Sequence, residues 1–230
     1  MLEPIAETID GKLVTVYPST HAPAPIVFSN DYVENGEGVL AHCAAEGSGP
    51  FHLVTISQMR WDEDLSPWAA DPVVSEEDHF TGEAKRHLGW MLDAVAPFAE
   101  DALGCQPAEK IIAGYSMAGL FALYASYLTD VFDGAVCVSG SVWFPGFLDF
   151  CRAHAFPKNP LAIYLSLGDR ESASRNAVLR TTQRAMEQLR DEFGSRHIPT
   201  VFELNPGNHF HDMDLRMAKG IGWILRAMSA

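Results

Sequence analysis

The stretch "KIIAGYSMAGLFALYASYL", residues 110–128, places one serine between a short apolar run and a longer one. The first run is typical of a buried strand, and the residues from Met117 onward are typical of a buried helix. A serine at such a junction can project its hydroxyl from a strained turn, where a substrate can reach it. Ser116 is therefore a candidate nucleophile. The alternative is a serine that only caps its own helix.

The residues around Ser116 suit a tight turn. Gly114 lies two positions before it, Ala118 stands where the motif G-x-S-x-G has its last glycine, and Gly119 follows. One added methyl group is a small departure, and Gly119 still permits close approach of helix and strand. The backbone N–H of Met117 would lie at a helix N-terminus, where it can donate to a developing oxyanion.

Short apolar runs alternate with helical patterns along the chain. Several runs are apolar at consecutive positions, which requires a sheet that is covered on both faces. The alternation predicts an α/β fold: one domain over residues 1–230, with a mainly parallel twisted sheet, helices on both faces and no large lid. The predicted strands are 12–17, 25–29, 51–57, 110–114, 134–139, 161–168 and 199–204, and the predicted helices are 36–46, 83–103, 117–129, 145–154, 174–194 and 212–229.

A base and an acid follow Ser116 in the chain order of a serine hydrolase triad, which is serine, acid, histidine. His209 lies in the loop-forming run "NPGNHFHD", before the last predicted helix. Asp169 and Glu171 both follow the predicted strand "LAIYLSLG", and either carboxylate could orient the histidine. We favour Glu171, because the triad acid commonly comes a few residues after the strand end, and aspartate next to glycine is often a turn residue.

Four stretches, "IIAGYSMAGLFALY", "VSGSVWFPGF", "LSLGDRE" and "NPGNHFHDMDLRM", together resemble the esterase branch of the α/β-hydrolases, which is related to enterochelin esterases and S-formylglutathione hydrolases. The resemblance implies a serine hydrolase that cleaves carboxylic esters without a cofactor. It also implies that Ser116 forms the acyl-enzyme, that His209 is the general base, and that Glu171 or Asp169 orients it. The partner would be a small-molecule ester, and short or compact acyl groups are expected.

The resemblance also implies an oxyanion hole. Met117 would supply the first N–H. The second donor should come from the loop after the strand "PIVFS", where many relatives have a His-Gly pair and this chain has "NDYVENGEG". The choice lies between Ser29, Asn30 and Asp31, and we favour Asn30.

Substrate contacts are predicted from two segments, 58–82 and 141–157. Arg60 opens "RWDEDLSP", which is similar to an Arg-x-x-acidic-Leu-x-Pro stretch of siderophore esterases with one residue more. Arg60 would bind an anionic part of the substrate, or else form a structural pair with Asp64. Aromatic side chains are typical of small-molecule pockets. The aromatic candidates are Trp61, Trp68, Trp143 and Phe144.

Charge and composition exclude several classes of protein. The formal net charge of -14 disfavours binding to nucleic acid or to an anionic membrane. The first residues lack the pattern of a secretory signal, and no apolar run reaches the roughly 18 residues of a membrane span. We therefore expect a cytoplasmic protein, and the sequence leaves its oligomeric state open.

The resemblance leaves acyl transfer to an alcohol open beside hydrolysis, and two alternatives to a serine enzyme remain at this point. The run "HFHDMD" brings His209, His211 and Asp212 close together in sequence, which raises the possibility of a metal-dependent hydrolase. No second histidine cluster with ligand spacing accompanies it, so no metal site is predicted. The other alternative is a non-catalytic binding protein with a hydrolase fold, since fold alone does not determine activity.

Overall fold

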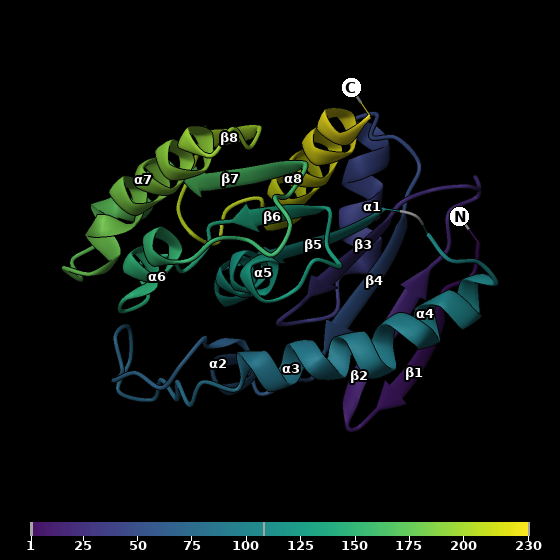
Figure 1. The fold of residues 1–230 in the computed structure, drawn as a ribbon, viewed down its shortest axis with the longest axis horizontal. Helices are drawn as coiled ribbons and strands as arrows, with labels where there is room; N and C mark the ends of the chain where they lie inside the picture. Colours follow the sequence, from purple (N-terminus) through teal and green to yellow (C-terminus); the bar gives the residue numbers. More distant parts are fainter. Residues whose placement is uncertain (1, 108, 230) are drawn as a thin grey trace.

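The computed structural model of the chain describes residues 2–107 and 109–229. Eight strands join one sheet in the order β1-β2-β4-β3-β5-β6-β7-β8 (Figure 1). The β1–β2 and β2–β4 pairs are antiparallel, and every other pair is parallel, so the prediction of a mainly parallel sheet is confirmed. The strands are β1 (Ile5–Ile9), β2 (Lys12–Tyr17), β3 (Ile26–Asn30), β4 (His52–Ser57), β5 (Lys110–Tyr115), β6 (Gly134–Val138), β7 (Ala162–Gly168) and β8 (Thr200–Asn205).

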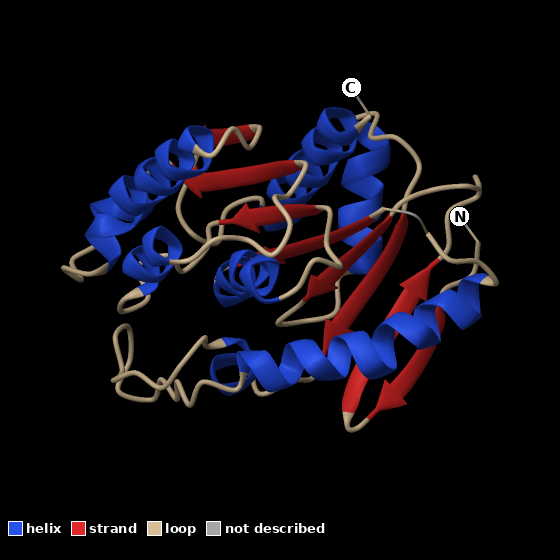
Figure 2. Cartoon of the chain, in the orientation of Figure 1, coloured by secondary structure: helices blue, strands red, loops and turns tan. Residues whose placement is uncertain are grey.

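Helices cover both faces of this sheet (Figure 2). On one face α1 and α8 pack against each other and against the sheet, and the longer helical layer with α3, α4, α5 and α7 lies on the other face. The helices are α1 (Gly36–Ala45), α2 (Trp61–Leu65), α3 (Ala84–Trp90), the π-helical turn η1 (Met91–Val95), α4 (Ala96–Leu103), α5 (Met117–Leu128), α6 (Phe147–Ala153), the 3₁₀ turns η2 (Glu171–Ala173) and η3 (Leu179–Thr181), α7 (Thr182–Ser195) and α8 (Met213–Met228).

The two faces of the sheet carry two separate apolar cores. In β5, Ile112 packs into the core under α5, while Ile111 and Ala113 pack into the core under α1 and α8. Successive side chains of a strand point to opposite faces, so a strand that is buried on both faces must be apolar at consecutive positions. This is the pattern from which the sequence predicted a doubly covered sheet.

Three elements differ from the prediction: the start of one helix, and the two elements α2 and β1, which were not predicted. The predicted helix 174–194 begins only at Thr182, because the Asn176 side chain accepts hydrogen bonds from the N–H groups of Val178 and Leu179 and so competes with helix formation. Strand β1 (Ile5–Ile9) was not predicted: it is mostly exposed at the sheet edge and lacks a buried apolar pattern. Among the described residues, no helix is long and apolar enough to cross a membrane.

Candidate active site

Ser116 lies at the turn between β5 and α5 with φ 60° and ψ -122°. A positive φ is strained for any residue with a side chain, and such strain concentrates at functional sites. Two backbone hydrogen bonds hold the turn: the Ser116 N–H donates to Val138 O at 3.0 Å, and the Ser141 N–H donates to Ser116 O at 3.0 Å. The chain therefore forms the sharp strand-to-helix turn that the sequence predicted.

Gly114 explains why this turn accepts an alanine at position 118. A Cβ atom on Gly114 would lie 2.3 Å from the backbone C and O atoms of Ala118, which no real side chain tolerates. Ala118 itself is fully buried, with its methyl group packed in the core. The close approach of strand and helix thus depends on Gly114, and the methyl group of Ala118 fits beside it.

His209 joins Ser116 to Glu171. Its Nε2 lies 3.2 Å from Ser116 Oγ, and its Nδ1 lies 2.7 Å from Glu171 Oε2. Asp169 has a different contact: its Oδ1 accepts a hydrogen bond from the Gly207 N–H at 2.9 Å, which braces the loop before His209. The structure therefore brings together Ser116, His209 and Glu171, and it gives Asp169 the turn role.

The Glu171 carboxylate is almost enclosed by hydrogen-bond donors. Its Oε1 accepts from Ser139 Oγ at 2.6 Å, from the Gly168 N–H at 2.7 Å and from Arg216 Nη2 at 3.0 Å. Burial by itself raises the pKa of Glu171, but the hydrogen bonds from His209 and Ser139 outweigh burial and lower the pKa to about 2. The ionised carboxylate holds the Nδ1–H of His209, so the Nε2 lone pair faces the serine hydroxyl.

Met117 is positioned as predicted for an oxyanion donor. It is the first residue of α5, and among the described residues no acceptor is found for its backbone N–H. The helix N-terminus adds a partial positive charge at this point. An oxygen bound beside Ser116 would therefore meet this N–H group.

Asn30, the predicted second donor, lines the cavity, but its side-chain amide is engaged with other partners and is not available as a donor. Its side chain is 1% exposed, with Oδ1 2.7 Å from His87 Nε2 and Nδ2 3.7 Å from Met91 Sδ, because strand alternation turns it toward the helical layer. The other candidates are also occupied: Ser29 Oγ donates to Asp31, and the Asp31 N–H donates to Ile56 O at 2.8 Å. No acceptor is found in the described residues for the next N–H in the loop, that of Tyr32, which lines the same cavity as Ser116.

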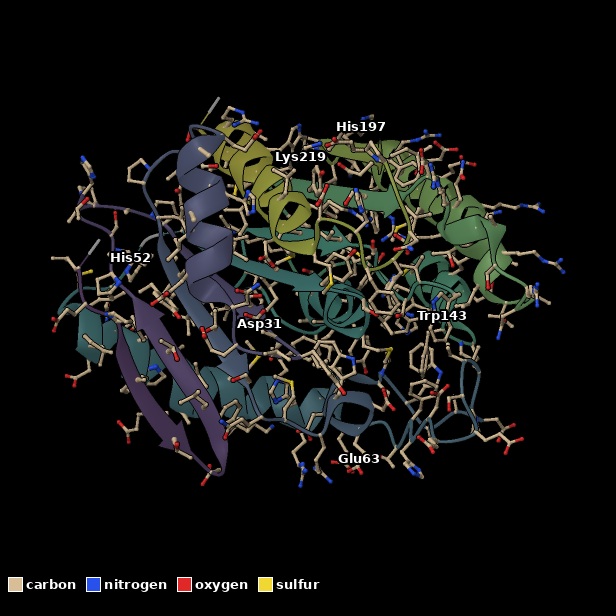
Figure 3. All side chains as sticks on the ribbon, turned by 180° about the vertical axis from the view of Figure 1, so that it is seen from behind. Asp31, His52, Glu63, Trp143, His197 and Lys219 are labelled. Atoms are coloured by element: carbon tan, nitrogen blue, oxygen red, sulfur yellow. The ribbon has the colours of Figure 1, made fainter. Side chains whose placement is uncertain are left out.

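A cavity of about 870 Å³ opens over Ser116 and His209. It extends between the end of β3, where Figure 3 labels Asp31, and the segment after β6, where the same figure labels Trp143. The walls include Trp61 as well as Trp143, so these two predicted contacts lie at the cavity. A volume of this size is typical of small-molecule sites.

Three solved structures with this topology allow a comparison, whereas no protein-family model and no curated protein matches the sequence. An IroE-like serine hydrolase from Shewanella oneidensis superimposes with a TM-score of 0.78 at 16% identity over 97% of this chain and 80% of that one. The siderophore hydrolase EstA from Aspergillus nidulans superimposes with a TM-score of 0.69 at 21% identity, over 99% of this chain and 94% of that one. The enterobactin esterase FES from Shigella flexneri superimposes with a TM-score of 0.70 at 16% identity, over 99% of this chain and 60% of that one.

The chain has the α/β-hydrolase fold. In this fold the nucleophile, the acid and the histidine come from turns at the carboxyl ends of parallel strands, which meet at one edge of the sheet. Here those turns follow β5, β7 and β8, and they carry Ser116, Glu171 and His209. At 21% identity or less the comparison shows the fold alone.

Two of the four predicted aromatic contacts are wrong for this α/β-hydrolase fold. Phe144 is 2% exposed and packs in the core. Trp68 packs against Phe144, and its Nε1–H donates to Pro145 O at 3.0 Å. Phe144 lies in the apolar core and Trp68 packs against it, and neither lines the cavity.

Arg60 does not line the cavity either, so of its two predicted roles the substrate contact is wrong and the structural pair with Asp64 is confirmed. Its guanidinium pairs with Glu63, and its Nη2 lies 2.8 Å from Asp64 Oδ1. Asp64 is 1% exposed and also contacts Lys12 Nζ at 2.9 Å. A buried carboxylate must be paired, and this need accounts for the position of Arg60.

The metal ligands of the alternative hydrolase are not brought together. His211 Nε2 lies 3.1 Å from Asp212 Oδ2, and both side chains are more than half exposed. Both ring nitrogens of His209 already have partners, Ser116 and Glu171. In the part of the chain that the structure describes, no three His, Cys, Asp or Glu side chains gather in a group able to hold a metal ion.

Sequence reasoning missed several residues around this site, above all Arg216. It is 1% exposed and contacts Glu171. Met213, Arg216, Met217 and Gly220 follow helical spacing, so they share one face of α8. A charged residue within that apolar face was the available signal. Met213 itself is 38% exposed at the cavity.

Proposed function

We propose that this protein is a serine hydrolase that cleaves carboxylic esters through an acyl-enzyme on Ser116. The observation that carries the proposal is the hydrogen-bonded series Ser116 Oγ to His209 Nε2 at 3.2 Å and His209 Nδ1 to Glu171 Oε2 at 2.7 Å. A serine hydroxyl is a weak nucleophile until an adjacent base takes its proton, and this series supplies the base and its orienting acid. The names of the three compared structures, a serine hydrolase, a siderophore hydrolase and an enterobactin esterase, support the same reaction class.

The reaction follows from these positions. His209 accepts the Ser116 proton as Oγ attacks the ester carbonyl carbon, and the N–H groups of Met117 and Tyr32 donate to the oxyanion. The imidazolium, stabilised by Glu171, then protonates the departing alcohol, which leaves an acyl group on Ser116. In the second half His209 takes a proton from water, the hydroxide oxygen attacks the acyl carbon, and the carboxylic acid leaves as the proton returns to Ser116.

The substrate would be a short or compact acyl ester. A cavity of about 870 Å³ with Trp61 and Trp143 in its walls suits a small substrate with apolar or aromatic parts. A series of 4-nitrophenyl esters of increasing acyl length tests this part. We expect kcat/KM to be highest for the short acyl groups, and faster turnover of the long-chain esters would contradict it.

The test of the reaction class is intact mass after treatment with a small alkyl fluorophosphonate. We expect one phosphonyl adduct on the wild type and none on Ser116→Ala or His209→Ala. Ser126→Ala is the matched control, because Ser126 lies in α5, the helix that follows Ser116, and its Oγ donates to Ala122 O, away from the cavity. The control should retain the adduct.

The opposite results separate the alternatives. A folded wild type that forms no adduct would contradict the serine mechanism and favour a non-catalytic binding protein. Ester hydrolysis that survives Ser116→Ala but stops with a chelator would favour the metal-dependent alternative.

A further inference from the structure

Arg216 lies in the first turn of α8, although this position is unfavourable for it. A cation near a helix N-terminus opposes the helix dipole, and a buried guanidinium loses its hydration. The side chain is 1% exposed, and among the described residues its Nε has no acceptor. Burial and helix stability alone therefore do not explain an arginine here.

The contacts of the guanidinium reach the neighbourhood of every triad residue. Nη2 donates to Glu171 Oε1 at 3.0 Å and also to Ser139 Oγ. Nη1 donates to the Tyr115 hydroxyl at 2.8 Å and to Asn208 O at 3.3 Å. Glu171 is the acid itself, Tyr115 precedes Ser116, and Asn208 precedes His209.

The Tyr115 hydroxyl links Arg216 to His209 through two hydrogen bonds. It donates its only proton to His209 O at 2.6 Å, so its lone pair accepts from Arg216 Nη1. The His209 ring also packs edge-on against the Tyr115 ring, with centroids 5.4 Å apart. The backbone of His209 is thus held to α8 through Tyr115, while its ring is held by Glu171.

We propose that Arg216 is a positioning residue of the triad: it holds Glu171 and the His209 loop in place, and its charge tempers the attraction of Glu171 for the protonated histidine. The inference rests on the proposed function. A planar fork with several donors can hold these groups at once, which an ammonium group cannot do. Because Glu171 balances both Arg216 and the imidazolium, the presence of Arg216 makes protonation of His209 less favourable.

The charged and titratable groups that face His209 come from several elements. Glu171 from η2 and Tyr115 from β5 contact His209, and Arg216 from α8 contacts Glu171. The other charged groups at the cavity are Glu34, Arg170 and Asp214, together with Asp31, whose burial raises its pKa to about 7; Asp31 is the same in the wild type and in the variants. Of these, Arg216 is the cation that contacts the carboxylate holding His209. Its removal therefore changes the charge balance of the triad directly.

The experiment measures the rate of Ser116 phosphonylation against pH, by intact mass with a small alkyl fluorophosphonate, so that no natural substrate is needed. In this step Ser116 Oγ forms a bond to phosphorus, the P–F bond breaks, fluoride leaves and His209 takes the serine proton. For Arg216→Met we expect a rate that is lower by roughly 10- to 100-fold. We also expect the pH of half-maximal rate to rise by about one unit.

Two conservative variants divide the two effects. Arg216→Lys keeps the charge and loses the fork, so we expect a lower rate with the half-maximal pH close to that of the wild type. Tyr115→Phe removes the hydroxyl contact to His209 O, so the rate should fall without a shift in pH. Arg226→Met, the same change at an exposed position of the same helix, is the control and should change neither quantity.

If Arg216 has only a structural role, Arg216→Met should have a lower thermal unfolding midpoint and a smaller labelled fraction, with an unchanged half-maximal pH. This result would overturn the inference. If Arg216→Met does not fold, wild-type rates in both Arg216→Lys and Tyr115→Phe would overturn it as well. If the wild type is labelled at Ser116 and the variants show the wild-type rate and half-maximal pH, only the inference about Arg216 is contradicted. A wild type that is not labelled contradicts the proposed function.

Discussion

The two sides of Ser116 are built differently. On one side, Glu171 and Arg216 have side chains that are 8% and 1% exposed, and their polar atoms are held by many hydrogen bonds. On the other side the cavity rim carries Tyr32, Val33 and Phe210, which are 74%, 70% and 78% exposed. Under the proposed function, the buried side would hold the groups that carry out the reaction. The exposed side chains at the rim would contact the substrate, and exposed loop residues can vary at little cost in stability.

The largest expected effect lies on the buried side and separates the two candidate acids. Glu171→Gln removes the charge that orients and stabilises His209, so kcat/KM for 4-nitrophenyl acetate should fall by roughly 10,000-fold. Asp169→Asn removes only an acceptor for the Gly207 N–H, and it should cost less than about threefold. Equal losses in the two variants would contradict the assignment of the acid.

The same carboxylate should make stability depend on pH. The pKa of Glu171 is about 2 in the folded protein against an ordinary value of 4.5, so the unfolded chain binds the proton more tightly. The carboxylate therefore contributes stability that is complete above about pH 4.5 and is lost as the pH falls toward 2, by about 3 kcal/mol in all. Urea unfolding at several pH values should show a shallower acid decline in Glu171→Gln. An unchanged slope would contradict this source of acid sensitivity.

The turn under Ser116 should tolerate no side chain at position 114. Gly114→Ala places a methyl group against the Ala118 backbone, and we expect a loss of about 1–3 kcal/mol in the free energy of unfolding, together with reduced labelling of Ser116. Gly89→Ala is the control, because a methyl group at this position of α3 would have no atom within 4 Å. It should be neutral or stabilising by about 0.5–1 kcal/mol. Equal midpoints in urea for the two variants would be the contrary result.

The smallest expected effect lies at the cavity wall, where Glu34 and Asp214 outnumber Arg170 and where burial raises the pKa of Asp31 to about 7, so that Asp31 carries only part of a charge near neutral pH. An anionic ester should be turned over more slowly than a neutral ester of similar length, by roughly tenfold at low salt. The difference in rate between the two esters should be smaller at high salt, because salt screens the repulsion. The comparison uses 4-nitrophenyl butyrate and the mono-4-nitrophenyl ester of succinic acid. Asp214→Asn should reduce the difference in rate between the two esters, whereas Asp191→Asn, at the surface of α7, should not. A preference for the anionic ester would contradict this prediction.

Prediction from sequence succeeded where local pattern and chain order carry the information. The apolar runs and glycines around Ser116 predicted the strand, the turn and the helix, and the loop before the last helix pointed to His209. Prediction failed for Asn30, Trp68 and Phe144, because each side chain packs against partners far away in sequence; for Arg60 the structure shows the alternative that the sequence had left open, the local pair with Asp64. Asn30 contacts His87 and Met91, and Arg60 pairs with a buried Asp64 that Lys12 also contacts.

The sequence by itself determined a doubly covered parallel sheet and the chain order of serine, acid and histidine, because strand periodicity and turn residues are local properties. Only the tertiary structure decided that Glu171 and not Asp169 contacts His209, and that the Asn30 side chain contacts His87. It also decided that the N–H of Tyr32 has no acceptor among the described residues and that Arg216 contacts Glu171. These outcomes depend on which hydrogen-bond donors and charges meet when distant segments pack together. Each buried polar group must find a hydrogen-bond partner in the folded protein, and the spacing of residues along the chain does not indicate which partner that is.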